Sequence, residues 1–474
     1  MDATTSQELQ QTLIDPQKQQ SAEKTAVEVV PDSAALLEDD ASKSTSLQFS
    51  ANLMKSITGS TSLIFPYTMW QMGLITGTTL TVFVVYVYIS FACRMLDVRK
   101  AFEKEEKDEN DPLYHLDNDY TILCYHYFGK AGYWLVLICT LITLWGSDMG
   151  TMILMTDFLS DLPPFNRIGS ASTRRILPTI ILLFFCWITS ILKNPTLLVS
   201  VSSLGLFALV IAFIVCLIDG GVRFGISWDK SVLFPQSLMG ILSTLGIIIN
   251  AFGFMLVLLP LYNNMKSQAK PKVKKNITGS LSLLGLIYLV TGIVLFLMYR
   301  SDPRHVQEAV IFNMKKDSLP FILVSITMVL TLLGSFPLLL LPCFEIMEAN
   351  HEKKENRLFV TDGYRFWTRT AQVVIITLIG YFIPVFSSIN AIIGSLTGVI
   401  VSQLVPAFLH LKAIGSKKGM WLVIEDWIVI VVFIGVMIIC TGSSVVDLIN
   451  KLKHFILCFP KPVQGHEWRI RRRV

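Results

Sequence analysis

Charged residues are scarce in this sequence of 474 residues, in which Asp, Glu, Lys and Arg together make up only 16%. Soluble domains carry about 25% charged residues, whereas 52% of this chain is hydrophobic. Such a chain lacks the polar side chains that would cover a large soluble core. Runs such as "VLICTLITLW" do not alternate in polarity, as the strands of a membrane β-barrel would. The composition therefore predicts an all-α polytopic membrane protein.

Motifs of metal sites, ATP sites and enzymes are also missing. No HExxH and no GxxxxGK(S/T) occurs. The apolar stretches hold no cluster of nucleophile and base that a membrane enzyme would need. The eight cysteines form no CxxC pair and lie scattered at positions 93, 124, 139, 186, 216, 343, 440 and 458. We therefore expect no metal, no cofactor and no enzymatic activity, so that any transport must draw on a gradient.

The chain divides into three regions by composition. The polar residues 1–50 are nearly devoid of aromatics and predict a disordered tail, residues 51–445 predict an eleven-helix domain, and residues 446–474 form a basic tail. About 20 consecutive apolar residues span a bilayer. The expected spans are 52–72, 75–93, 133–158, 176–192, 196–218, 236–262, 279–299, 319–344, 370–386, 391–411 and 423–445.

The distribution of Lys and Arg predicts the orientation of the chain. With the N-terminus in the cytoplasm, the inner connections carry 20 Lys and Arg and the outer connections carry 9, as the positive-inside rule requires. The last segment, "EWRIRRRV", conflicts with this orientation, because an odd number of spans puts its positive charge outside. The basic run "KSQAKPKVKK" (266–275) is interpreted as a topology determinant that touches anionic lipid, not as a nucleic-acid site.

Two expected spans are interrupted by polar and small residues. The first contains "LMKSITGSTSLIFPY" and the sixth reads "ILSTLGIIINAFGFMLVLLPLYNNMK". Carriers with inverted repeats bind substrate where two such helices break, because unwound backbone exposes N–H and C=O groups. Close helix packing at small residues is the alternative explanation. The expected substrate-binding residues are Thr58, Gly59, Ser60, Thr61, Ser62, Asn250, Ala251, Phe252 and Gly253.

Four stretches resemble the amino acid/auxin permease family, and within it the branch of proton-coupled amino acid transporters. The stretch "LMKSITGSTSLIFPY" (53–67) resembles the family's first-helix signature, and "LLPLYNNMK" (258–266) is similar to the end of its sixth helix. The stretch "PLLLLPCFEIMEAN" (337–350) resembles its eighth helix, and "IGYFIPVFSSINAIIGSLTG" (379–398) resembles its ninth and tenth. The resemblance extends over residues 50–445.

The resemblance implies a fold and a substrate class. It implies an eleven-helix carrier of the amino acid–polyamine–organocation superfamily, with a 5+5 inverted repeat, that moves small amino acids by alternating access. The substrate carboxylate would lie at residues 59–62, where a half-helix starting near Thr61 directs N–H groups at an anion, and the ammonium or the side chain at residues 250–253. Thr61 replaces the second glycine of the family's pair, and Phe252 and Gly253 stand where relatives often carry an acid. The amino acid and the coupling ion, proton or sodium, therefore stay open.

Among the ionisable residues within expected spans, two are candidates for a function, because a charge there costs about 2.5 kcal/mol or more. Asp148, in "LWGSDMGTM", is a candidate to bind a substrate amine, sodium or a proton, unless Ser147, Thr151 or a neighbouring helix satisfies it. Lys55 precedes the first break by one turn. It either extends toward the cytoplasmic face or takes the place of a coupling ion, which favours proton coupling.

The membrane and the mode of action keep alternatives. The tail contains "DSAALL" (32–37), an acidic-dileucine pattern that endosomal sorting adaptors read, so both the plasma membrane and the endolysosomal membrane stay candidates. A proton-coupled amino acid carrier is the leading hypothesis. An amino-acid sensor with a transporter fold and little flux is the second, because of the departures at Thr61 and Gly253 and the long tail.

Overall fold

The computed structural model describes residues 43–105, 118–168, 171–192, 196–348, 360, 362–415 and 419–457. These residues form α-helices joined by short 3-10 and π turns, and within them there is no strand; an isolated bridge pairs Ser44 with Met265. The "DSAALL" pattern and the "EWRIRRRV" segment lie outside the described residues.

The helices follow the expected spans in order. The first half contains α4 (Ser46–Ile57), α5 (Phe65–Met72), α6 (Leu74–Phe102), α7 (Asp119–Ser160), α8 (Ala171–Ser190) and α9 (Thr196–Arg223). The second half contains α10 (Leu238–Ala251), α11 (Met255–Asn263), α12 (Val273–Tyr299), α13 (Leu319–Glu348), α14 (Gly363–Phe382), α15 (Phe386–Ile393), α16 (Val405–Ala413) and α17 (Met420–Leu457). The 3-10 turn η1 (Ser60–Ile64) precedes α5, and the π turns η7 (Gly394–Gly398) and η8 (Ile400–Leu404) link α15 to α16.

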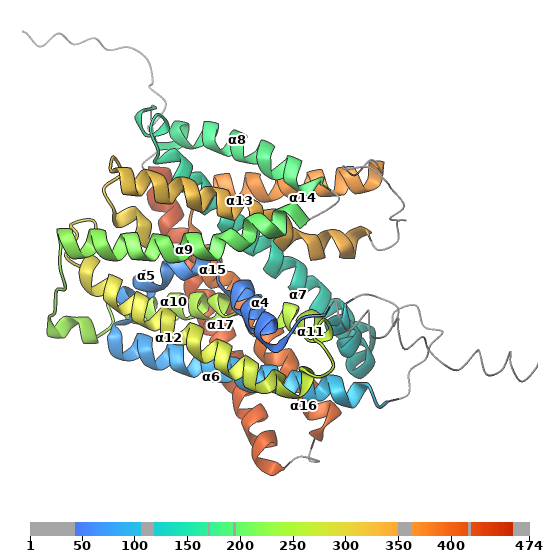
Figure 1. Ribbon diagram of the computed structural model, residues 1–474. Coiled ribbons are helices and arrows are strands. Elements are labelled where there is room, and N and C mark those ends of the chain that lie inside the picture. The colour runs from blue at the N-terminus through green and yellow to red at the C-terminus, as the bar shows by residue number, and fades with distance from the viewer. Residues whose placement is uncertain are drawn as a thin grey trace, which may run out of the picture.

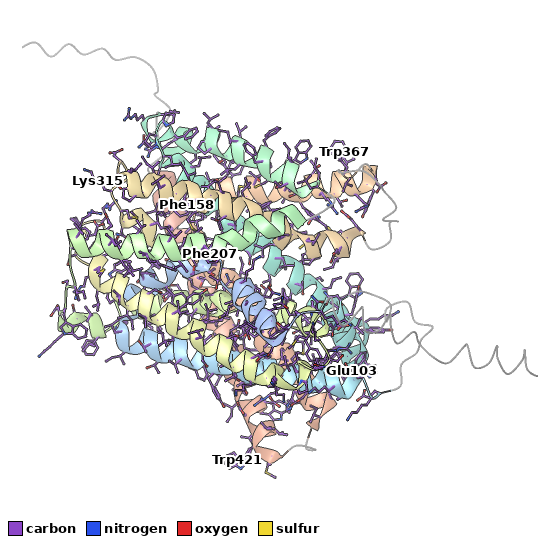
Figure 2. All side chains as sticks on the ribbon, viewed as in Figure 1. Glu103, Phe158, Phe207, Lys315, Trp367 and Trp421 are labelled. Atoms are coloured by element: carbon purple, nitrogen blue, oxygen red, sulfur yellow. The ribbon has the colours of Figure 1, made fainter. Side chains whose placement is uncertain are left out.

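Seven helical stretches among the described residues are long and apolar enough to cross a membrane. They are Leu74–Phe102, Asp119–Ser160, Leu238–Asn263, Lys270–Tyr299, Leu319–Glu348, Phe386–Ala413 and Met420–Lys453. Large apolar side chains such as Phe207, Trp367 and Trp421 are exposed on the outside of the bundle (Figure 2), as lipid-facing side chains are. The chain is therefore a multi-pass membrane protein, while the count of eleven spans and the inverted repeat stay predictions.

Several boundaries differ from the expected ones. The expected tail boundary at residue 50 lies inside α4, because the Thr45 side chain caps that helix by accepting from Gln48 N at 3.3 Å. The expected end of the domain at residue 445 lies inside α17. The outer connection expected at residues 387–390 is helical and belongs to α15. The actual interruption lies at residues 383–385, where Pro384 prevents continuation of α14.

Both expected helix breaks are present. The helix α4 ends at Ile57 and α5 follows only after η1, while α10 ends at Ala251 and α11 begins at Met255. In Figure 1 these segments lie in the middle of the bundle, between α9 and α13 on one side and α6 and α12 on the other. The breaks therefore face each other in the interior of the protein.

Main-chain hydrogen bonds tie the beginning of the first broken helix to the end of the second. Ser44 N donates to Asn264 O at 2.8 Å, and Lys266 N donates to Ser44 O at 3.0 Å. Ser44 precedes α4, and Asn264 follows α11 directly. The outer ends of α4 and α11 are thus joined as two adjacent strands of a sheet would be.

Candidate functional site

A central cavity of about 390 Å³ lies where the two broken helices meet. Small-molecule sites occupy about 300–1,000 Å³. Among the described residues that line the cavity, no side chain is acidic. The two breaks contribute Lys55, Ser56, Thr58, Gly59, Ser60, Thr61, Asn250 and Gly253, and α7 and α13 contribute Thr143, Ser147, Thr151, Thr331 and Ser335. Hydroxyl groups, amides and the backbone of the breaks therefore form the polar part of a wall that also carries apolar side chains such as Ile249, Phe254 and Leu332.

The first break exposes backbone N–H groups to the cavity. Thr58 leaves the helical region with φ −79° and ψ 99°, and Gly59 is extended. The N–H groups of Ser60 and Thr61, at the start of η1, have no partner within the helix, whereas Ser62 N donates to Gly59 O at 3.1 Å. A Cβ atom at Gly59 would meet no atom within 4 Å, so the missing side chain leaves the main chain accessible. This geometry suits an anion such as a carboxylate.

The second break is held by side-chain amides. Gly253 N donates to Asn250 O at 3.0 Å, which closes a single tight turn after α10. The Asn250 side chain donates through Nδ2 to Asn390 Oδ1 at 2.8 Å, and Asn390 Nδ2 in turn donates to Phe386 O at 2.8 Å. Asn390 also lines the cavity. The amide pair therefore fixes the break in α10 against α15.

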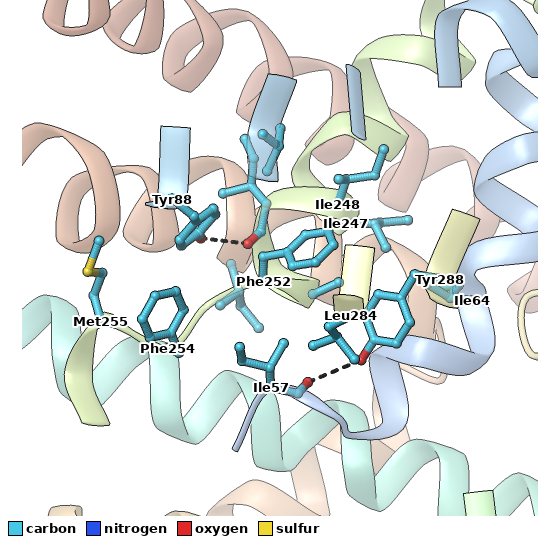
Figure 3. Packing of buried hydrophobic residues seen from close by; sticks show 14 of the residues in the cluster. Ile57, Ile64, Tyr88, Ile247, Ile248, Phe252, Phe254, Met255, Leu284 and Tyr288 are labelled. Carbon is cyan, nitrogen blue, oxygen red and sulfur yellow. Dashed lines mark hydrogen bonds between the residues drawn. The ribbon is translucent and has the colours of Figure 1, made fainter. Parts of the chain in front are cut away.

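Two tyrosines reach the carbonyl groups next to the breaks (Figure 3). Tyr88, on α6, donates to Ile249 O at 2.7 Å, and Tyr288, on α12, donates to Ile57 O at 3.5 Å. Both side chains are buried. The Phe252 ring packs against the Tyr288 ring with centroids 5.5 Å apart. At each break, a buried tyrosine hydroxyl thus donates a hydrogen bond to a carbonyl at the end of the helix.

One face of α7 and one face of α13 supply hydroxyl groups. Thr143, Ser147 and Thr151 are spaced four residues apart, so they share one side of α7. Thr331 and Ser335 have the same spacing on α13. Thr143 Oγ1 donates to Thr397 Oγ1 in η7 at 2.7 Å. From the sequence, Ser147 and Thr151 were expected only as partners of Asp148, and Thr143, Thr331 and Ser335 were not predicted, although hydroxyl residues at a four-residue spacing in an apolar span are a readable signal.

Asp148 does not line the cavity. Its electrostatic neighbours include the thiols of Cys186 on α8 and Cys343 on α13. Both of its carboxylate oxygens are buried and accept no hydrogen bond within the described part of the chain. The expected partners Ser147 and Thr151 line the cavity, and Thr151 Oγ1 donates to Ser147 O at 3.0 Å. The residue is therefore buried between helices, away from the two breaks.

The structure brings together most of the expected binding residues. Thr58, Gly59, Ser60, Thr61, Asn250 and Gly253 line the cavity, together with the coupling candidate Lys55. Ser62, Ala251 and Phe252 are buried behind its wall, and Ser62 Oγ donates to Gly59 O at 2.7 Å. The role of each residue in binding stays a prediction. In the described ranges, no group of three or more His, Cys, Asp or Glu residues is placed to hold a metal ion.

Comparison with known proteins gives a consistent family. Residues 42–446 match the family model described as transmembrane amino acid transporter protein. The chain is 22% identical over 402 residues to amino acid transporter ANT1 of Arabidopsis thaliana, which covers 80% of this chain and 87% of that protein. It is 25% identical over 199 residues to amino acid transporter AVT3A of the same plant, which covers 42% of this chain and 43% of that protein.

A human protein is similar over most of the described helices. The chain is 21% identical over 390 residues to solute carrier family 38 member 10 of Homo sapiens, which covers 78% of this chain and 33% of that protein. The matches to AVT3A and AVT3C thus span less than half the length of those relatives. The names of the relatives describe transporters and not enzymes.

Proposed function

The chain belongs to the transmembrane amino acid transporter family, and from this premise we propose that it carries small amino acids across a membrane as a secondary active transporter. The observation that carries the proposal is the central cavity between two helix breaks. A zwitterionic amino acid needs donors for its carboxylate and acceptors for its ammonium group. The two breaks offer both within one cavity.

The carboxylate of the substrate would bind at the first break. The N–H groups at Gly59, Ser60 and Thr61 begin a helical stretch that continues through η1 into α5, and the start of a helix attracts negative charge. The ammonium group would face carbonyl oxygens and the Asn250 amide at the second break. Hydroxyl groups of Ser147 and Thr151 complete the polar wall. No acidic side chain is needed for a neutral amino acid.

The central cavity extends toward one side of the membrane and is closed by side chains toward the other, which supports alternating access. The cavity lining extends from the breaks along Asn52 and Lys55 of α4 and along Leu256 and Val257 of α11. On the opposite side, the Trp70 ring stacks on His305 with centroids 5.7 Å apart. We infer an inward-facing state, if the N-terminus is cytoplasmic.

An ion-paired cluster joins several elements on this closed side. Lys451 on α17 donates to Glu308 at 3.0 Å, and Glu308 also accepts from Ser387 N at 2.9 Å. Glu308 belongs to the connection between α12 and α13, and Ser387 lies in the first turn of α15. Opening the site to the other side of the membrane would require these contacts to separate.

The two tyrosine hydrogen bonds support an inverted repeat. In a 5+5 repeat the first span corresponds to the sixth and the second span to the seventh. Tyr88 belongs to the second expected span and binds the sixth, and Tyr288 belongs to the seventh and binds the first. A pseudo-two-fold axis would exchange these two hydrogen bonds. The repeat is therefore part of the proposal, together with the eleven spans.

Proton coupling is the proposal for the driving ion. A hard cation prefers several oxygen ligands, whereas the electrostatic neighbours of Asp148 include the thiols of Cys186 and Cys343. A proton needs only the carboxylate itself. Lys55, which lines the cavity, is the second candidate for coupling. Because Asp148 does not line the cavity, its protonation would act on transport through the packing of α7 against α8 and α13.

Uptake into proteoliposomes tests the proposal. A panel of labelled amino acids is offered under an imposed proton gradient or an imposed sodium gradient, with Asp148→Asn as the test variant. Asp97→Asn is the matched control, because Asp97, near the end of α6, pairs with Lys274 of α12 and does not line the cavity. Proton-driven uptake that Asp148→Asn alone abolishes or uncouples supports the proposal. Binding of an amino acid without gradient-driven flux contradicts it and favours the sensor.

A further inference from the structure

A second cavity, of about 370 Å³, opens on the outside of the bundle at the bend of α7. We call it the kink pocket. Its walls come from α7 and α16. Every wall residue is apolar or glycine, and they are Cys124, Phe128, Ala131, Gly132, Leu135, Val136, Val405 and Phe408. Leu135 is 50% exposed and Phe408 is 37% exposed. The pocket therefore faces the surroundings of the bundle and not the central cavity.

A sharp bend at Gly129 creates the kink pocket. Gly129 has φ 67° and ψ −159°, a conformation that side chains disfavour. The bend separates residues 119–128 from the membrane-crossing part of α7. At Gly132 a Cβ atom would lie 2.7 Å from Cys124 O, so the two parts of α7 touch with no side chain between them. The pocket is the space that remains between this bend and α16.

The kink pocket lies at the boundary of the membrane. Asp119, at the start of α7, is 3.3 Å from Arg99 near the end of α6 and is also contacted by Asn263 at the end of α11. Residues 119–128 therefore lie at the level where the neighbouring helices end. Tyr133 and Trp134 follow the bend, and the Trp134 side chain is 56% exposed. Exposed Trp and Tyr are enriched at the membrane interface.

Two lysines accompany this apolar pocket. The Lys412 Nζ atom lies 5.1 Å from the centroid of the Phe128 ring, which is a wall of the pocket. Lys130 is exposed and adjoins the wall residue Ala131 in sequence. The charge at the rim and the apolar interior together match a molecule with an anionic head and a hydrocarbon tail. A free phosphate would leave the apolar walls unused, and an uncharged lipid would leave the lysines unused.

We propose that the kink pocket binds an anionic glycerophospholipid, with one acyl chain against Phe128, Leu135 and Phe408 and the phosphate group near Lys130 and Lys412. Basic pockets at the ends of membrane helices on the cytoplasmic side attract anionic head groups. The lipid would fill the bend of α7. Further along the same helix, Thr143, Ser147 and Thr151 line the central cavity. Occupancy of the pocket therefore bears on the helix that forms one wall of the transport site.

Native mass spectrometry of the purified full chain tests the site, with phosphatidylglycerol and phosphatidylcholine as competing probes. The test variant is Lys130→Gln/Lys412→Gln. The matched control is Lys230→Gln/Lys315→Gln, which removes the same charge from exposed positions outside the basic run 266–275. We expect the preference for phosphatidylglycerol to fall about fivefold for each lysine removed at the pocket and to be unchanged in the control.

A second variant tests the apolar part of the site with both lysines in place. Leu135→Trp adds bulk at an exposed wall position and should displace the bound phosphatidylglycerol. An unchanged preference in Lys130→Gln/Lys412→Gln would overturn the proposal, and so would an equal loss in the control, which would indicate unspecific attraction to basic surface. Undiminished binding to Leu135→Trp would overturn it independently, since the acyl chain would then lie elsewhere.

Discussion

Tyr88 and Tyr288 each donate a hydrogen bond to the helix break that the other one follows in sequence. Tyr88 lies on the helix after the first break and binds Ile249 O at the second, whereas Tyr288 lies on the helix after the second break and binds Ile57 O at the first. Each carbonyl stands where a helix ends and would otherwise lack a partner. The two broken helices are therefore positioned by one another's neighbours.

Removing the Tyr88 hydroxyl should destabilise the second break. In Tyr88→Phe the carbonyl of Ile249 loses a partner at 2.7 Å in a buried place, which costs about 1–3 kcal/mol in free energy of unfolding. Denaturant titration of the purified protein measures this cost. The neighbouring Tyr86→Phe is the control, because Tyr86 is exposed and binds only Glu425 at 3.2 Å among the described residues. Equal losses in both variants would contradict the role of Tyr88.

Tyr288→Phe should have a smaller effect on stability than Tyr88→Phe. Its bond to Ile57 O is 3.5 Å long, at the limit of a hydrogen bond, so we expect a loss below about 1 kcal/mol. The same titration measures it. A loss larger than that of Tyr88→Phe would show that the bond at the first break is the stronger one.

Substitutions at Gly59 and Gly394 should affect amino acid uptake and stability in opposite ways. Gly59→Leu should leave the free energy of unfolding within about 0.5 kcal/mol of wild type, because a Cβ there meets no atom within 4 Å, while its side chain fills the cavity. We expect the efficiency of amino acid uptake to fall about tenfold, which corresponds to about 1.4 kcal/mol of binding. Normal uptake by a folded Gly59→Leu would remove the first break from the binding site.

Gly394→Ala should show the opposite pattern. A Cβ at Gly394 would lie 1.9 Å from Gly246 O, so α10 and η7 would have to move apart. Overpacking of this kind costs about 1–3 kcal/mol, measured by denaturant titration beside Gly59→Leu. A variant as stable as wild type would mean that this helix crossing adapts freely.

The carboxyl group of Asp302 should make stability depend on pH outside the membrane. Burial opposes its ionisation, but bonds from Arg304 and Asn313 outweigh burial and hold the pKa of Asp302 below its ordinary value, which is about 3.9. The stabilisation is therefore complete above that ordinary value and is lost as the pH falls through the lowered pKa. Thermal unfolding at acidic and neutral pH should show this loss in wild type and a smaller one in Asp302→Asn.

Breaking a buried ion cluster should destabilise the packing of α17. Asp426 is fully buried, pairs with Arg94 of α6, and lies 2.6 Å from His410 Nδ1 of α16. Asp426→Ala leaves the Arg94 charge without this partner, and we expect a loss of about 3–5 kcal/mol in free energy of unfolding. Asp97→Ala is the control, because its pair with Lys274, whose side chain is 43% exposed, is open to solvent on the lysine side, and such a pair is worth about 1 kcal/mol. Similar losses would argue against a structural role for the cluster.

The two breaks were predictable because they are local. Consecutive hydroxyl residues and a glycine at 58–62, and an asparagine with a glycine at 250–253, cannot continue an apolar helix at low cost, and the structure breaks both helices there. The partners of the breaks were not predictable. A tyrosine inside an apolar span resembles a packing residue, and the bond from Tyr88 to Ile249 joins residues 161 positions apart.

The direction of a side chain around its helix was also beyond local reasoning. Depth in the membrane follows from position along a span, so Asp148 was expected near the middle of the third span; the structure buries its side chain, and its role stays a prediction. Which face of α7 meets the cavity depends on how that helix rotates against α8 and α13. Ser147 and Asp148 are consecutive on α7, yet Ser147 lines the cavity and Asp148 lies near the thiol of Cys186. Such rotations are set by packing over the whole bundle.

The main-chain bonds between Ser44 and the segment after α11 have a mechanical consequence. Because Ser44 is bonded to both Asn264 and Lys266, the outer ends of α4 and α11 cannot swing independently. A displacement of the outer end of α4 would either break these two main-chain hydrogen bonds or carry the outer end of α11 with it. These two bonds therefore couple α4 and α11, the two half-helices that border the central cavity.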